Sequence, residues 1–158
     1  YHKALTQLDA CGVMYCWTLL NVVQPSYGWT RTLLVPDPEH GLKPAASSHQ
    51  LRIFGAYSRR VRAGMQRVKA ASSNPDLLAT AFIGAGSERT LILLNRSAVA
   101  QKVDVKWPGA KFRYLETASP QQENSVEPSP AGASLEVLVA PGAIVTLSNV
   151  ELGKVTGV

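Results

Sequence analysis

The sequence LLATAFIGAGSERTLILLNRSAVAQKVDVKW, residues 77–107, decides the fold of this chain of 158 residues. Its apolar segments are short, and they are either β-branched or alternate with polar residues. Turn-forming residues separate them about every eight to twelve residues. The pattern predicts antiparallel strands at Leu77–Ile83, Thr90–Asn95 and Gln101–Trp107.

The same pattern extends in both directions from this stretch. Further strands are predicted at Gln66–Ala71, Lys111–Glu116, Ser134–Val139 and Ala143–Ser148. Seven short strands with regular turn signals are typical of a β-sandwich. Between the fifth and sixth strands, Thr117–Gly132 is rich in Ser, Pro, Gln and Glu, which predicts a long exposed loop.

The residues before the sandwich follow a different pattern. Residues 3–10 resemble the tail of a helix, and a second helix is predicted from Ser48. Between them, residues 12–21 form a continuous apolar run, as in a strand that is buried on both faces of a parallel sheet or barrel. Residues 22–46 carry four prolines and two glycines and are predicted to be a loop.

The apolar run at residues 12–21 needs a partner. Exposure of its six large apolar side chains would cost about 1.5 to 3 kcal/mol each. The total, on the order of 10 kcal/mol, rivals the stability of a whole domain. We therefore expect a companion chain or a missing N-terminal segment to cover this strand, and the absence of an initiator methionine agrees with a start inside a longer polypeptide.

The charge of the chain is uneven. Residues 1–70 hold nine Lys/Arg and three Asp/Glu, a balance of +6, whereas residues 71–158 hold seven and eight, a balance of −1. The cationic run comprises Arg52, Arg59, Arg60, Arg62, Arg67 and Lys69. We interpret it as a solvated helix end with salt bridges at a junction. A polyanion partner is the alternative, but no nucleic-acid motif accompanies the run.

No apolar run is long enough for a membrane span, and the N-terminus lacks the order of a signal peptide. Cys11 and Cys16 would lie roughly 16 Å apart in an extended segment, too far for a disulfide with each other. The cysteines and histidines lack metal-ligand spacing, so we expect no metal and no cofactor. Asn95-Arg96-Ser97 fits the N-glycosylation pattern, yet Asn95 is equally suited to end a strand.

Several phrases of the chain, in this order, resemble the C-terminal third of clan A glycoside hydrolases, most closely glycoside hydrolase family 30. The phrases are Gly12-Val13-Met14-Tyr15-Cys16-Trp17, Lys43-Pro44, Phe54 to Gly64, Asp76 to Phe82, Leu91 to Ser97 and Ala140 to Leu147. The resemblance implies a mixed fold, in which the terminal βα segment of a (β/α)8 barrel precedes an all-β antiparallel sandwich of about seven strands. We predict a barrel segment at residues 1–62, the sandwich at 63–150 and a C-terminal tail at 151–158.

The resemblance also implies retaining hydrolysis of β-linked glycans by two glutamates, both upstream of Tyr1. Retention requires two carboxyl groups about 5 to 5.5 Å apart, and this chain offers no credible pair. Asp37 and Glu39 share a Pro-rich loop, where a solvated turn role is favoured over catalysis. We therefore expect no catalytic residue here, and no hydrolase activity from the isolated chain.

Trp17, Tyr27 and Trp29 are the predicted substrate-binding residues. Trp17 falls where the family places an aromatic residue at the mouth of the barrel, and an indole face can stack on a sugar ring. Tyr27 and Trp29 follow the strand, where a barrel displays specificity residues. The alternative for Trp17 is a barrel-core residue, and for the other two it is loop packing.

Two other classes of protein compete with a glycosidase portion. A stand-alone carbohydrate-binding or accessory sandwich would need a strip of exposed rings, whereas the strands offer mainly Phe82, Trp107, Phe112 and Tyr114. An interaction domain would pair through the apolar run at residues 12–21. The resemblance favours a β-linked glycan as substrate, no nucleic-acid partner, and secreted or lysosomal placement.

Overall fold

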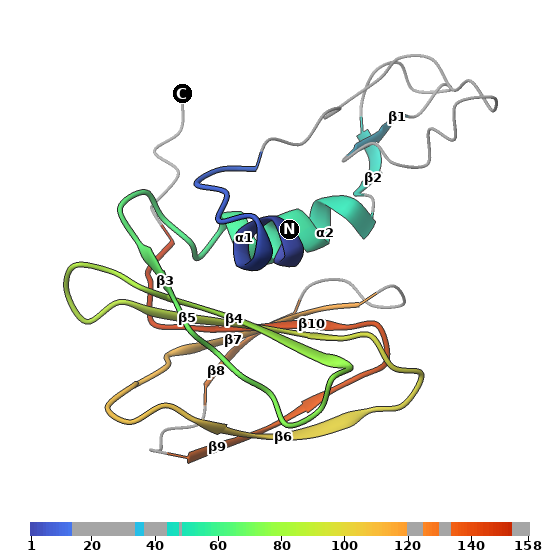
Figure 1. Cartoon of the computed structure of the whole chain (residues 1–158). Coiled ribbons are helices and arrows are strands. Elements are labelled where there is room, and N and C mark those ends of the chain that lie inside the picture. Colours follow the sequence, from blue (N-terminus) through green and yellow to red (C-terminus); the bar gives the residue numbers. More distant parts are fainter. Residues whose placement is uncertain (14–33, 37–43, 48, 120–124, 130–133, 153–158) are drawn as a thin grey trace. The chain divides into compact units, whose positions relative to one another are not determined.

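The computed structural model of the protein describes residues 1–13, 34–36, 44–47, 49–119, 125–129 and 134–152 (Figure 1). These residues form two compact units, Tyr1–Gly55 and Ala56–Val158. No helix in the described part of the chain is long and apolar enough to cross a membrane.

The first unit contains two helices and a small sheet. Helix α1 spans His2–Gln7, and helix α2 spans His49–Ser58, so its last residues belong to the second unit. Both helices overlap the predicted ones, although α1 ends at Gln7, before the predicted end at residue 10. The rings of Tyr1 and Phe54 pack together with centroids 5.8 Å apart.

Strands β1, Leu34–Pro36, and β2, Pro44–Ser47, pair antiparallel in the region predicted to be a loop. The loop prediction was wrong at these residues, because proline is compatible with short edge strands. The predicted barrel strand at residues 12–21 lies almost wholly outside the described residues. The barrel assignment for residues 1–62 therefore stays a prediction.

The second unit is an antiparallel β-sandwich, as predicted. Its larger sheet has the order β3-β4-β5-β10-β7-β8, and every neighbouring pair is antiparallel. The strands are β3 (Gln66–Val68), β4 (Leu77–Ile83), β5 (Arg89–Asn95), β7 (Tyr114–Ala118), β8 (Ser125–Pro128) and β10 (Ile144–Ser148). The second sheet pairs β6 (Gln101–Lys106) with β9 (Ser134–Val139). Figure 1 shows the two sheets stacked as layers.

Two strand predictions and one loop prediction differ from the structure by more than one residue. The strand predicted at Gln66–Ala71 already ends at Val68, and the one predicted at Lys111–Glu116 begins only at Tyr114. The loop predicted at Thr117–Gly132 contains β8, which pairs with β7 at the edge of the large sheet. The polar composition of β8 suits an edge strand with little burial. The strand was missed because the prediction relied on apolar residues.

Two Pro-Gly turns direct the chain between strands. Gly109 and Gly142 both have positive φ, and each follows a proline. The turns close through hydrogen bonds from the Ala110 amide to the Trp107 carbonyl (3.0 Å) and from the Ala143 amide to the Ala140 carbonyl (3.1 Å). This is the arrangement of a type II turn, in which glycine supplies the left-handed conformation.

The core lies between the two sheets. The face of the large sheet that contributes to it, here called the inner face, is entirely aliphatic in its buried centre. Its members on the three central strands are Leu77, Ala79, Ala81, Leu91, Leu93, Val145 and Leu147. The alternate residues of the same strands point to the opposite, outer face.

Candidate functional site

The three predicted substrate-binding residues, Trp17, Tyr27 and Trp29, lie outside the described residues. So do Asp37 and Glu39. The structure therefore leaves the predicted sugar wall as a prediction. The notable chemistry of the described residues lies on the outer face of the large sheet and in a cavity beside β6.

A buried ion pair occupies the outer face. Arg60 follows helix α2 and is 1% exposed, and Glu116, in the middle of β7, is 5% exposed. The Arg60 Nε atom donates to Glu116 Oε1 at 2.5 Å, and Nη2 contacts the same oxygen. Nη1 donates to the Val150 carbonyl. Removing one member of such a pair would leave a buried charge without its partner, so the two residues fasten the chain after α2 to the sheet.

The arginine run is therefore only partly as predicted. Arg59 approaches Glu116 at 3.6 Å, which confirms the expected salt bridges. Arg62, Arg67 and Lys69 are exposed. Arg60 is the exception to the predicted solvated helix end, because the carboxylate on β7 compensates its burial.

An exposed cluster continues from this ion pair. The Arg60 guanidinium lies 4.1 Å from the centroid of the Tyr114 ring, within cation–π range. The Tyr114 hydroxyl donates to Glu151 at 2.5 Å, and Arg113 pairs with the same carboxylate at 3.0 Å. The hydrogen bond from Tyr114 lowers the pKa of Glu151 and raises the pKa of Tyr114. The cluster attaches the segment after β10 to β7.

Buried hydroxyl groups complete the outer face. Thr146 donates to the Ala56 carbonyl at 3.1 Å, and Thr90 donates to the Arg60 carbonyl at 2.9 Å. These bonds satisfy backbone oxygens at the end of α2, where the helix itself supplies no donor. Tyr57 is buried beside Thr80, and burial raises the pKa of its phenol. The outer face therefore binds residues 56–60 through specific hydrogen bonds.

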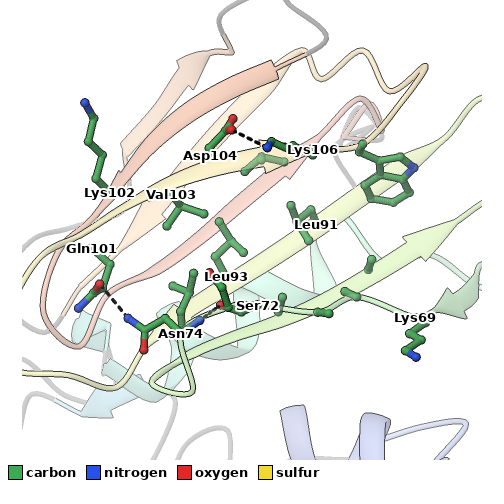
Figure 2. Close-up of a pocket in the computed structure, with 18 of the residues that line it drawn as sticks. Lys69, Ser72, Asn74, Leu91, Leu93, Gln101, Lys102, Val103, Asp104 and Lys106 are labelled. Carbon is green, nitrogen blue, oxygen red and sulfur yellow. Dashed lines mark hydrogen bonds and ion pairs between the residues drawn. The ribbon is translucent and has the colours of Figure 1, made fainter.

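A cavity of about 690 Å³ opens on the other side of the sheet, beside β6 (Figure 2). Its apolar floor includes Leu91 and Leu93, and Val103 points toward them from β6. Asn74 donates to Gln101 at 2.9 Å across it. Asp104 accepts from Ser134 at 2.5 Å, a bond that lowers the pKa of this exposed carboxyl.

The aromatic residues of the sandwich do not form a binding strip. Phe82 is buried on the outer face, and Tyr114 lies under Arg60. Trp107 meets Phe112 edge to face at 5.9 Å, and both are partly buried against the core. Trp107 thus caps the core.

Asn95, the candidate glycosylation site, is fully buried. Its Nδ2 donates to the carbonyls of Val99, Val139 and Ala140, and its Oδ1 accepts from Ser97. A glycan on Nδ2 would displace these bonds. The triplet therefore serves as a turn, and we expect the intact mass of the protein expressed in a glycosylating host to show no glycan at Asn95.

Five of the described carboxylates are engaged in ion pairs. Glu116 and Glu151 bind arginines, Asp104 and Glu136 lie against lysines, and Asp76 lies 3.5 Å from Arg96. Within the described part of the chain, no three His, Cys, Asp or Glu side chains gather as metal ligands. The described interactions attach residues 56–60 to the outer face of the large sheet.

Residues 64–147 match the glycosyl hydrolase family 30 beta sandwich domain. This match covers more than half of the chain, and the chain belongs to that family. No curated protein sequence matches it.

Solved structures agree on the fold. The family 30 subfamily 8 xylanase Xyn30A from Clostridium acetobutylicum superposes with a TM-score of 0.61 at 12% identity, over 74% of this chain and 30% of the xylanase. A GH30 endoxylanase from Clostridium papyrosolvens C71 gives 0.56 at 13%, over 65% and 28%. A conserved exported protein from Bacteroides fragilis gives 0.57 at 14%, over 65% and 22%. The chain thus spans less than a third of each.

The sequence analysis missed the ion pair of Arg60 with Glu116. Its signal was nevertheless present. Tyr114, Glu116 and Ala118 alternate along β7, which places a carboxylate on the same face as two buried neighbours in the sheet, Thr146 and Ile144. A carboxylate at a buried strand position requires a cation, and the arginine run after α2 is one source of cations in the sequence.

Proposed function

We propose that the chain is the C-terminal portion of a retaining β-glycoside hydrolase, in which the sandwich supports a (β/α)8 barrel. Both catalytic glutamates would lie upstream of Tyr1. Residues 12–30 would contribute an aromatic wall to the sugar cleft through Trp17, Tyr27 and Trp29. The family match of the sandwich, together with the small share of each relative that the chain spans, supports this proposal.

The proposal that the sandwich supports the barrel rests on the outer face of the large sheet. Its buried ion pair and hydroxyl groups hold the end of α2 and the residues that follow it. The resemblance assigns α2 to the last barrel helix. A barrel joined through this helix would be oriented by the sandwich. Directional bonds suit that purpose better than apolar contact, because they specify one geometry.

The substrate in this proposal is a β-linked glycan, and the partner is the remainder of the barrel, either as a companion chain or as a preceding segment. Of the two placements that the resemblance implies, we propose secretion, since one structural relative is described as an exported protein. The domain bounds 1–62, 63–150 and 151–158 belong to the same proposal.

Hydrolysis of an aryl β-glycoside tests this function. We expect natively purified material that includes the barrel to release the aryl group, and the 158-residue chain alone to release none. Glu39→Gln in the isolated chain is the matched control, because Glu39 is a carboxylate near the predicted sugar wall. Activity of the isolated chain that disappears in Glu39→Gln would contradict the proposal.

A further inference from the structure

The peptide bond between Arg62 and Ala63 lies in a turn between α2 and β3. The Met65 amide donates to the Arg62 carbonyl at 3.1 Å, and Gly64, the third residue of the turn, has a φ of 84°. This is the arrangement of a type II turn. The Arg62 amide donates to the Met65 sulfur at 3.3 Å, and a thioether is a weak acceptor. Opening the turn therefore breaks one ordinary hydrogen bond and one weak one.

The backbone of this turn is accessible. Arg62, Ala63 and Gly64 are three consecutive exposed residues. A Cβ atom placed on Gly64 would meet no atom of the described residues within 4 Å, so the turn borders open space. A protease binds its substrate in an extended conformation, and exposed loop backbone with few internal hydrogen bonds reaches that conformation at low cost.

The side chain before the bond selects the class of protease. Arg62 presents a cation to a specificity pocket that holds a carboxylate, as in trypsin. Neighbouring basic residues are less suitable. Arg60 is only 1% exposed. Lys69 is exposed, but Val68 and Ala70 on either side of it pack against the core.

Both sides of the turn are fastened to the large sheet. Before it, the Arg60 side chain binds Glu116, and the Arg60 carbonyl accepts from Thr90 at 2.9 Å. After it, β3 pairs with β4 over its whole length. Cleavage between residues 62 and 63 leaves all of these contacts in place, so the two pieces have a reason to stay together.

We propose that the Arg62–Ala63 bond is a proteolytic cleavage site for serine proteases with an acidic specificity pocket, and that the cleaved protein persists as a two-chain form. The protease adds water across the peptide bond, which leaves a carboxylate on Arg62 and an amine on Ala63. Residues 1–62 and 63–158 then remain associated through the outer face. The inference is independent of the proposed function, because it rests on contacts within the second unit.

Limited digestion with trypsin tests the proposal on both the 158-residue chain and the natively purified protein. N-terminal sequencing and intact mass identify the new termini. We expect the terminus at Ala63 to appear about tenfold faster than the terminus at Ala70, which cleavage after Lys69 would produce.

Two variants locate the cut. Arg62→Gln should abolish the terminus at Ala63, whereas the matched control Lys69→Gln, also an exposed cation, should leave its rate of appearance unchanged. Circular dichroism checks that both variants fold.

The association of the pieces is measured by size-exclusion chromatography after the protease has been inhibited. We expect residues 1–62 and 63–158 to elute together without denaturant and to separate in concentrated urea.

Three results would overturn the proposal. They are a terminus at Ala63 that forms no faster than the one at Ala70, its absence from the digested natively purified protein, and separation of the pieces without denaturant. Hydrolysis of an aryl glycoside by the uncleaved protein is measured separately, so failure here and failure of the proposed function are distinguishable.

Discussion

The two faces of the six-stranded sheet are both buried, but by different chemistry. The inner face, from Leu77 through Leu93 to Leu147, is aliphatic and packs within the sandwich. The outer face has polar groups at its centre: Thr80, Thr90, Glu116, Thr146 and Ser148 are each at most 5% exposed. The inner face gains stability from apolar area, whereas the outer face gains geometric specificity from hydrogen bonds and an ion pair.

The difference between the two faces separates the stability of the sandwich from the attachment of the segment at the end of α2. An aliphatic face tolerates small shifts of whatever packs on it, because dispersion contacts have little direction. The carbonyls of Ala56 and Arg60 each accept from a threonine on the outer face, which restricts the position of the end of α2 and of the residues that follow it. We infer that the inner face holds the domain together and the outer face positions the neighbouring segment.

The largest effect is expected from Glu116→Ala on the outer face. Arg60 would remain buried without its carboxylate, so the free energy of unfolding should fall by about 3–5 kcal/mol. Urea denaturation followed by circular dichroism measures this loss. The double variant Arg60→Met, Glu116→Leu should recover most of it, because it removes both charges. A double variant as unstable as the single one would contradict the role of the charge pair.

The inner face is tested by Leu147→Ala. Leu147 is fully buried, and truncation should lower the free energy of unfolding by about 2–5 kcal/mol through lost burial and a residual cavity. The matched control is Leu138→Ala on β9, where the side chain is 69% exposed and the change should stay within about 0.5 kcal/mol. Equal losses in both variants would mean that the inner face is not the core.

A smaller effect is expected from Thr146→Val, which replaces one hydroxyl on the outer face by a methyl group. The Ala56 carbonyl would lose its donor, at a cost of about 1–3 kcal/mol. Thr146→Ser retains the hydroxyl and serves as the control. Thermal unfolding should rank the serine variant above the valine variant, and the reverse order would show that shape matters here more than hydrogen bonding.

The smallest effect concerns the exposed cluster beside the ion pair. The hydrogen bond from the Tyr114 hydroxyl holds the pKa of Glu151 below its ordinary value. The ionised Glu151 carboxylate therefore stabilises the folded protein fully at pH values above its ordinary pKa. This stabilisation is lost as the pH falls through the lowered pKa. Tyr114→Phe should raise the pKa of Glu151. A titration of the Glu151 carboxyl by NMR checks this shift, and an unchanged pKa would exclude the hydrogen bond as its main cause.

The sandwich was predictable because its strands carry local signals. Leu77–Ile83 and Ser134–Val139 agree with the structure at both ends, since alternation and β-branched residues mark each strand and its boundaries. Asn95 was readable as a turn residue for the same reason. The pairing of strands that lie far apart in the sequence could not be predicted, because neither register nor strand order follows from a local sequence pattern.

The outer face shows where local patterns cease to inform. Arg60 and Glu116 are 56 positions apart, and each alone resembles an ordinary surface residue. Only the strand order, which places β7 beside β10, brings the carboxylate under the end of α2. Likewise, the burial of Arg60 two positions before the exposed Arg62 was not predictable, since both belong to the same run of cations.

The most direct test of the account is the intact mass of the natively purified material together with its molar mass by size-exclusion light scattering. We predict that the 17.0 kDa chain elutes with a larger companion chain or as part of a longer polypeptide, and that glycosidase activity follows that species. A well-folded monomer of 17.0 kDa would contradict the account. The apolar run at residues 12–21 would then be covered within the chain, and the barrel assignment for residues 1–62 would be wrong.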